Sequence, residues 1–280
     1  MRALVDSHIH FWDPDHLHYT WLAEVPAINR PYTPAVLSEA AEGLNLERIV
    51  FVQADCVPEE GLEEVRWVSN LAAGDARIQG IVAFAPLQQG EAASTYLAEL
   101  TRFRLVKGVR RLIQSEALGF SIQPDFIAGV QQLPDFGFSF DLCIMHHQLP
   151  DVLMLVEQCP DVSFVLDHFG KPAIKEAIIE PWASHIRSLA AFPNVMCKLS
   201  GLVTEAHHET WTPADLQPYI EHILDAFGPN RLMFGGDWPV SELASSYSRW
   251  VETAQAALAH LSEHDQEKIF YQNALDFYRL

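Results

Sequence analysis

The sequence predicts an α/β protein built as a single (β/α)8 barrel, and three observations lead to this prediction. Eight short apolar runs rich in β-branched residues recur along the 280 residues, with helix-like segments between most of them. The starts of consecutive runs lie 25 to 45 residues apart, and most gaps are close to 30, which suits repeated strand–helix units. Polar and titratable side chains collect at the carboxyl ends of the runs, where barrel enzymes place their active sites.

The apolar runs give the predicted strands. In chain order they are Ala3–Phe11, Arg48–Ala54, Ile78–Leu87, Val106–Ile113, Phe138–Met145, Ser163–Phe169, Val195–Leu202 and Arg231–Trp238. The runs are apolar throughout rather than alternating, which is typical of strands covered on both faces. Eight parallel strand–helix units match the size of a (β/α)8 barrel, and a doubly wound open sheet is the alternative.

Apolar residues at helical spacing predict the connecting helices. These are Gly61–Ala73, Thr95–Phe103, Phe126–Leu133, Val152–Gln158, Trp182–Phe192, Leu216–Phe227 and Ser248–His260. The stretch Asp13–Glu47 contains four prolines and is predicted to be a long irregular loop of the kind that often carries function. Because we find no Gly/Ser-rich linker, residues 1–280 are predicted to form one domain.

Composition narrows the classes of partner. The chain has 18 Lys and Arg against 37 Asp and Glu, a net charge of −19, which argues against nucleic-acid and anionic-membrane binding. The four cysteines form no C-x-x-C pair, so buried free thiols are expected. No signal-like segment and no run of 18 apolar residues is found, and we expect a cytoplasmic protein.

The sharpest chemical signal is the pair His8 and His10 at the end of the first run. Residues i and i+2 of a strand share a face, so both imidazoles point into the barrel mouth if that face is inward. Such a pair can hold a divalent metal or donate hydrogen bonds to a substrate oxygen. His168 and Asp237 end two other runs, and a barrel would bring them beside the pair. Three histidines and a carboxylate can form a zinc site, or the carboxylate can act as a general base.

Cations near the predicted mouth are candidates for binding a negatively charged group. Arg110 and Arg111 are adjacent in one strand, so at most one of them faces inward. Arginine suits bidentate carboxylate binding, whereas Lys171 and Lys198 suit a single oxygen. Salt bridges that brace the strands are the structural alternative for all of these cations.

Three further residues are weaker candidates. Of the adjacent His146 and His147 only one can face inward, and His146 is considered as a metal ligand or substrate contact. Asp167 either points outward or braces His168 as a hydrogen-bond acceptor. Trp12 could line a sugar-sized pocket, although aromatic core residues are at least as common.

These residues and their neighbours resemble the amidohydrolase superfamily, whose members are (β/α)8 barrels that open with His-x-His after the first strand. Within it, the sequence is similar to the amidohydrolase-2 sugar-lactonase group, which includes L-fuconolactonase and L-rhamnonolactonase. The matching stretches run from residue 5 to residue 240. They are VDSHIHFWDP, FVQAD, KGVRRLIQ, FVLDHFGKP, CKLSGLVTEA and FGPNRLMFGGDWPV.

The resemblance implies that water hydrolyses a lactone, or less often an amide, at this mouth. Carried over position by position, it assigns the catalytic and metal-ligating roles to His8, His10, His168 and Asp237, and substrate binding to Arg110, Lys171 and, more weakly, Gln53. Many metal-dependent superfamily members use a carboxylated lysine on the fourth strand, but KGVRRLIQ carries its lysine, Lys107, at the start. We therefore expect one weakly held divalent ion, with zinc as the candidate, or none.

The predicted mechanism polarises the lactone carbonyl through a metal on the three histidines, or through hydrogen bonds from them, while Asp237 removes a proton from water. A non-oxidative decarboxylase of an aromatic or unsaturated acid is the second hypothesis, and a non-catalytic sugar-acid binding protein is the third. The GVR, DHFGKP and CKLSG series favours the lactonase. The substrate is a small-molecule lactone of undetermined identity, because specificity on this fold lies in the loops. A homo-oligomer is left open.

Overall fold

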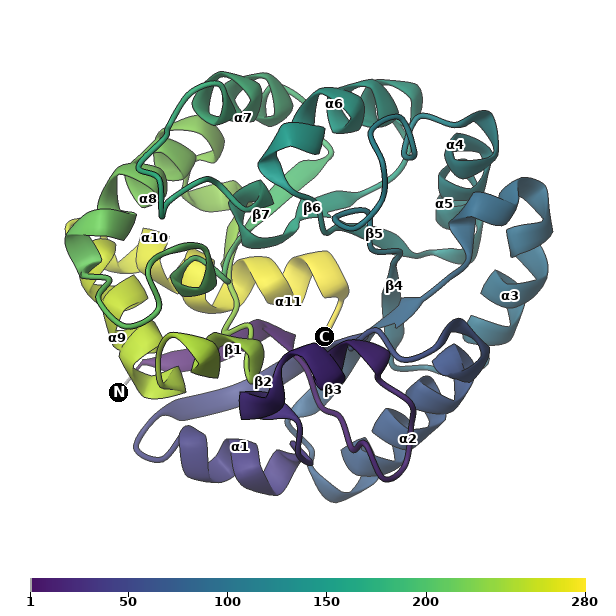
Figure 1. Cartoon of the computed structure of the whole chain (residues 1–280), viewed down its shortest axis with the longest axis horizontal. Helices are drawn as coiled ribbons and strands as arrows, with labels where there is room; N and C mark the ends of the chain where they lie inside the picture. Colours follow the sequence, from purple (N-terminus) through teal and green to yellow (C-terminus); the bar gives the residue numbers. More distant parts are fainter. Residues whose placement is uncertain (1) are drawn as a thin grey trace.

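The computed structural model describes residues 2–280 and confirms the predicted (β/α)8 barrel (Figure 1). Eight parallel strands follow one another around the barrel in chain order. They are β1 (Ala3–Ile9), β2 (Asn45–Val52), β3 (Ile78–Phe84), β4 (Val106–Arg110), β5 (Ser139–Leu142), β6 (Phe164–Leu166), β7 (Val195–Leu199) and β8 (Leu232–Phe234). A parallel bridge between Ile9 and Trp238 joins the end of β1 to the chain just after β8.

Helices form the outer ring (Figure 1). Each of the seven predicted helices overlaps an observed one. The α-helices are α1 (Pro34–Ala40), α2 (Gly61–Gly74), α3 (Ala93–Leu100), α4 (Pro124–Gln131), α5 (Leu133–Phe136), α6 (Leu149–Gln158), α7 (Trp182–Ala190), α8 (Pro213–Phe227), α9 (Tyr247–Ala257), α10 (Glu263–Glu267) and α11 (Asn273–Tyr278). No helix within residues 2–280 is long and apolar enough to cross a membrane.

The expectation of an irregular loop over Asp13–Glu47 is wrong. This segment contains the 3-10 helices Thr20–Glu24 and Pro26–Ile28, helix α1, and the first residues of β2. Pro26 and Pro34 each occupy the first turn of a helix, where a backbone N–H would have no helical partner in any case. These two of the four prolines therefore mark helix starts rather than an unstructured loop.

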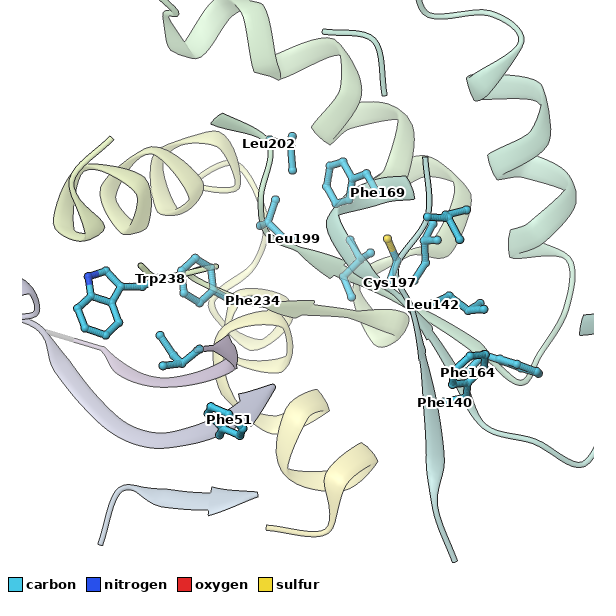
Figure 2. Packing of buried hydrophobic residues seen from close by; sticks show 14 of the residues in the cluster. Phe51, Phe140, Leu142, Phe164, Phe169, Cys197, Leu199, Leu202, Phe234 and Trp238 are labelled. Carbon is cyan, nitrogen blue, oxygen red and sulfur yellow. The ribbon is translucent and has the colours of Figure 1, made fainter. Parts of the chain in front are cut away.

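Strand side chains alternate between the helix layer and the barrel interior. Some inward positions are charged, for example Arg110, Asp141 and Lys198, so the strands are not apolar throughout as predicted. Outward side chains pack against the helices: Phe140 contacts Phe126 of α4, and Phe234 stacks on Trp250 of α9. Figure 2 shows part of this layer, with aromatic and aliphatic side chains of successive strands packed together. Inward positions are apolar at the floor, as at Val50, but charged nearer the mouth. The barrel interior can therefore present chemistry at one end alone.

Helix α11 crosses the amino ends of the strands and closes the barrel floor. Its Tyr278 is fully buried and packs with Val5, Val50 and Met233 inside the barrel. The Arg279 guanidinium donates hydrogen bonds to Lys107 O at the start of β4 and to Gly137 O just before β5. Figure 1 shows α11 in the middle of the ring of strands. A ligand must therefore enter at the carboxyl ends of the strands.

Several strands stop earlier than predicted at this carboxyl end. Strand β6 ends at Leu166 and β8 at Phe234, because the residues that follow leave the extended conformation. His168, Lys171 and Asp237 have φ angles of 52°, 50° and 53°. These values lie in the left-handed region, which residues other than glycine rarely adopt. Strained backbone of this kind clusters at functional sites. Here it turns the chain so that these side chains lie over the barrel mouth.

Candidate active site

The structure brings together the four residues that the sequence singled out. His8 lies in β1, His10 just after it, His168 after β6 and Asp237 after β8, and all four are buried. The Nε2 atoms of His8 and His10 are 3.2 Å apart. Asp237 Oδ1 lies 3.8 Å, 3.5 Å and 3.7 Å from Nε2 of His8, His10 and His168. One carboxylate therefore faces three imidazoles.

Backbone hydrogen bonds between β1 and the end of β8 fix this arrangement. Asp237 N donates to His8 O at 2.8 Å, and His10 N donates to Trp238 O at 2.7 Å. The buried Asp6 carboxylate accepts hydrogen bonds from the backbone N–H groups of His8 and Gly236, both at 2.9 Å. The relative position of the histidine pair and Asp237 is thus set by main-chain geometry.

Hydrogen bonds to Nδ1 orient two of the imidazoles. His10 Nδ1 lies 2.7 Å from Val52 O, and since a carbonyl oxygen can only accept, Nδ1 carries the proton and Nε2 keeps its lone pair. His168 Nδ1 pairs with Ser200 Oγ at 2.9 Å. Gly201 packs directly beneath the His168 ring, where a Cβ atom would overlap it. Both Nε2 atoms therefore point at Asp237.

Burial sets the charge of the site. Burial lowers the pKa of His168 to about 4, and it also lowers the pKa of His10 and, strongly, that of His8. Burial opposes ionisation of Asp237, but the surrounding histidines, beginning with His168, outweigh it and hold its pKa below the ordinary aspartate value. At neutral pH the site contains neutral imidazoles and an ionised carboxylate.

These donors fit a divalent metal. His8, His168 and Asp237 offer ligand atoms that lie within 4.8 Å of one another, and His10 Nε2 adjoins them. Two ligands about 2.1 Å from a tetrahedral zinc ion lie about 3.4 Å apart, close to the separations of 3.2 to 3.8 Å found here. In a second group, Cys143 with Asp167 and His168, the ligand atoms also lie within 4.8 Å of one another. Burial raises the pKa of the Cys143 thiol to about 11, however, which disfavours the thiolate that a metal needs.

Arg110 is the inward-facing member of the arginine pair. Its guanidinium donates to Gln53 O at 2.6 Å and to Asp167 Oδ2 at 3.2 Å, and Nη1 lies 3.3 Å from His8 Nε2. Arg111 points outward to Glu116. A fixed positive charge therefore adjoins the histidine group.

Lys198 and Asp167 lie beneath the cavity. The sequence offered Lys198 as a contact to a substrate oxygen or as a brace between strands, and Asp167 as a brace for His168. Lys198 is completely buried, and its Nζ lies 2.5 Å from Asp141 Oδ2, 3.0 Å from Asp167 Oδ1 and 3.1 Å from His8 Nδ1. Burial lowers the pKa of Lys198, but the two carboxylates offset this and leave it above the ordinary value. Asp167 adjoins His8 Nδ1 at 3.3 Å, whereas Ser200 pairs with His168. Asp167 therefore braces His8, not His168.

A cavity of about 270 Å³ opens above the histidine group. Its lining includes the aromatic side chains Trp12 and Trp21 together with Arg110, Lys171, His10, His168 and Asp237. Gln53 lies behind this wall, and its side-chain oxygen accepts a hydrogen bond from Asp55 N at 2.6 Å. His146 lines a separate groove of about 900 Å³ that shares Lys171 with the cavity. His146 Nδ1 contacts Lys171 O at 2.9 Å, away from the three other histidines.

The sequence analysis missed three residues near the site. Asp141 supports Lys198, Glu205 lies 3.8 Å from the Lys171 ammonium, and Asp6 joins β1 to β8. A lone acidic residue inside an apolar run, as in FSFDLCIM, is the one signal that could have found Asp141. Charged residues are almost never fully buried without a partner.

A family model described as amidohydrolase matches residues 5–280. The chain belongs to the amidohydrolase family. It is 37% identical over 277 residues to an L-fucono-1,5-lactonase of Burkholderia multivorans, and this match covers 92% of each chain. It is 30% identical to an L-fucono-1,5-lactonase of Burkholderia ambifaria, covering 100% of this chain and 97% of the relative.

A comparison with solved structures also identifies an amidohydrolase. The crystal structure of an amidohydrolase from Burkholderia multivorans with bound zinc matches this fold with a TM-score of 0.90. The two chains are 33% identical, and the match covers 100% of both. A structural neighbour in this amidohydrolase family thus holds zinc, and this chain presents a group of histidine and aspartate donors that fits one.

Proposed function

We propose that this protein hydrolyses a small sugar-derived lactone to its hydroxy acid in the cavity above His8, His10, His168 and Asp237. The observation that carries the proposal is that Asp237 Oδ1 lies 3.5 to 3.8 Å from the Nε2 atoms of three histidines at the mouth of an amidohydrolase barrel. The L-fucono-1,5-lactonases among its relatives support a sugar lactone as the substrate class. The cavity volume of about 270 Å³ suits one small ring.

Asp237 is the proposed general base. It removes a proton from the attacking water and later returns it to the ring oxygen, which leaves as a hydroxyl group. The carbonyl oxygen gains negative charge during the attack, and the buried Arg110 guanidinium supplies fixed positive charge beside it. Arg110 lines the cavity, so its charge lies next to a bound ligand.

His8, His10, His168 and Asp237 would hold a divalent metal, with zinc as the ion that fits. A bound ion would supply Lewis-acid polarisation of the carbonyl or lower the pKa of a water molecule. We propose that such an ion is held weakly, because the Arg110 guanidinium lies 3.3 Å from His8 Nε2 and like charges repel.

Lys171 and Trp12 both line the cavity and are proposed to bind the substrate, with Lys171 also binding the product carboxylate. Its ammonium has an ion-pair distance of 3.8 Å to Glu205, too long for a hydrogen bond, so it can turn toward a ligand. Gln53, His146 and Lys198 shape the site from behind or beside it. We also propose a cytoplasmic location, supported by four free, buried cysteines, and action without a nucleic-acid or membrane partner, supported by the net charge of −19.

A panel of lactones, including L-fucono-1,5-lactone, tests the proposal through acid release with a pH indicator. Asp237→Asn is expected to lower kcat/KM by about 10²- to 10⁴-fold because the base is lost. The exposed Asp225→Asn serves as the matched control and should be unchanged. Near-normal hydrolysis by a folded Asp237→Asn variant would contradict the role. Release of CO2 from an aromatic acid, without lactone hydrolysis, would point to a decarboxylase instead.

A further inference from the structure

Two cations line the catalytic cavity, and they are held in different ways. Arg110 is fixed, since its guanidinium donates hydrogen bonds to Gln53 O at 2.6 Å and to Asp167 Oδ2 at 3.2 Å. The Lys171 ammonium faces Glu205 Oε1 as an ion pair at 3.8 Å, which is too long for a hydrogen bond. Of the two cations, Lys171 is therefore the one that can move toward a ligand.

Backbone contacts hold Lys171 and Glu205 at the border between the cavity and the neighbouring groove. Lys171 lines both the cavity and the groove, whereas Glu205 lines the groove. Lys171 N donates to His168 O at 2.8 Å, and Lys171 O lies 2.9 Å from His146 Nδ1. Lys175 N donates to Glu205 O at 3.0 Å, which joins the segment after β6 to the segment after β7. Both main chains are thus anchored, and the Lys171 side chain lies between the two spaces.

Hydrolysis changes the charge of the molecule in the cavity. A lactone is neutral, whereas its hydroxy acid ionises at neutral pH and carries one negative charge. The charged residues that line the cavity are Asp55, Arg110, Lys171 and Asp237, and their formal charges cancel. A lactone therefore meets a lining without net charge, but the product carboxylate must find a cation close to the Asp237 carboxylate. Lys171 is the cation that can move to meet it.

Movement of Lys171 toward the product has a cost at Glu205. The Glu205 side chain is 18% exposed, and burial raises the pKa of its carboxyl group. The Lys171 ammonium is the strongest influence in the opposite direction, because it stabilises the carboxylate. Turning Lys171 away leaves a largely buried carboxylate without this cation, which is unfavourable. Glu205 and the product carboxylate therefore compete for one ammonium group.

We propose that Glu205 is a positioning residue that draws the Lys171 ammonium away from the cavity, so that the site binds the neutral lactone in preference to the hydroxy acid and releases the acid after hydrolysis. The lactone has no carboxylate that must compete with Glu205, so its binding does not depend on separating the ion pair. This inference rests on the proposed lactone hydrolysis, and it names the residue that sets the affinity for product relative to substrate.

The test uses substitutions that change charge at nearly constant side-chain volume. Glu205→Gln removes the competing carboxylate, Lys171→Met removes the cation, and the double variant removes both. Glu209→Gln is the matched control, since Glu209 is an exposed glutamate in the lining of the same groove. Circular dichroism verifies that each variant is folded. The probe is the potassium salt of the hydroxy acid formed from whichever panel lactone is hydrolysed fastest, beginning with L-fuconate.

Isothermal titration calorimetry measures the Kd of this acid without turnover, and initial rates give KM for the lactone. The ratio of Kd to KM should fall about five- to tenfold in Glu205→Gln, because the acid no longer competes for the ammonium, and should be unchanged in Glu209→Gln. In the Lys171→Met background, Glu205→Gln should change the Kd of the acid less than about twofold, because the ammonium is already absent.

Two results would overturn the inference while leaving the proposed function intact. One is an unchanged ratio of Kd to KM in folded Glu205→Gln. The other is an equal gain in acid affinity in the Lys171→Met background, which would show that Glu205 repels the acid directly and does not act through Lys171. A panel in which no lactone is hydrolysed would instead contradict the proposed function, and this inference with it.

Discussion

Gly201 offers a direct test of how the backbone positions His168. It follows Ser200, which pairs with His168 Nδ1 at 2.9 Å, and its φ angle is 63°. A Cβ atom at this position would overlap the His168 ring atoms. Gly43 has a φ angle of 83° and nothing within 4 Å of its Cβ position. The two glycines therefore separate backbone strain from collision with the imidazole.

The expected magnitudes differ accordingly. Alanine in the left-handed region costs about 1–2 kcal/mol, partly offset by about 0.4–1 kcal/mol from the less flexible unfolded chain. Gly43→Ala should therefore lower the free energy of unfolding by about 1 kcal/mol and leave activity unchanged. Gly201→Ala adds an overpacking cost of about 1–3 kcal/mol. It also displaces His168 Nε2 from its 3.7 Å contact with Asp237, and kcat/KM should fall by about 10²-fold.

Urea unfolding followed by tryptophan fluorescence gives the stability change, and lactone hydrolysis by the same preparations gives the activity change. Equal effects of Gly201→Ala and Gly43→Ala on both quantities would refute the reasoning. A loss of stability at Gly201 with full activity would show that the His168 position is not set by this contact.

Two further predictions concern titration. Because burial lowers the pKa of His168 to about 4, kcat/KM should stay level as pH falls past the ordinary histidine value of 6.5, and decline near 4; an acid limb at 6.5 would contradict this. Burial raises the pKa of Glu64 from 4.5 to about 8, so between these values the folded protein keeps a proton that the unfolded chain releases. The free energy of unfolding should therefore fall, relative to Glu64→Gln, by up to about 1.4 kcal/mol per pH unit from pH 4.5 to 8. A pH-independent difference in urea midpoints would contradict the buried, protonated state.

Periodic and local signals allowed much of the fold and of the site to be predicted. The eight apolar runs marked every strand, and the alternation of side chains along β1 placed His8 and His10 on one face. His168 and Asp237 were found because carboxyl ends of parallel strands meet at one rim. These inferences depend only on residues that are neighbours in the sequence and on the regular spacing of the strand–helix units.

The supporting residues could not be predicted, because their partners come from distant elements. Asp141 is placed by β5, Lys198 by β7 and Tyr278 by α11, and no spacing in the sequence relates them. The role of Asp167 was misassigned for a local reason. The left-handed backbone at His168, with φ of 52°, turns its ring toward Ser200 and leaves Asp167 facing His8.

The seam between β8 and β1 also bears on how the chain folds. It is held by bonds such as Ser7 Oγ to Phe234 O and Gly236 N to Asp6 Oδ1, which join residues 227 and 230 positions apart. Contacts this distant in sequence form late, because the entropy of closing a long loop must first be overcome. His8 and Asp237 lie on either side of this seam. During refolding, helical circular dichroism should therefore recover before catalysis, and turnover itself should report the moment at which the barrel closes.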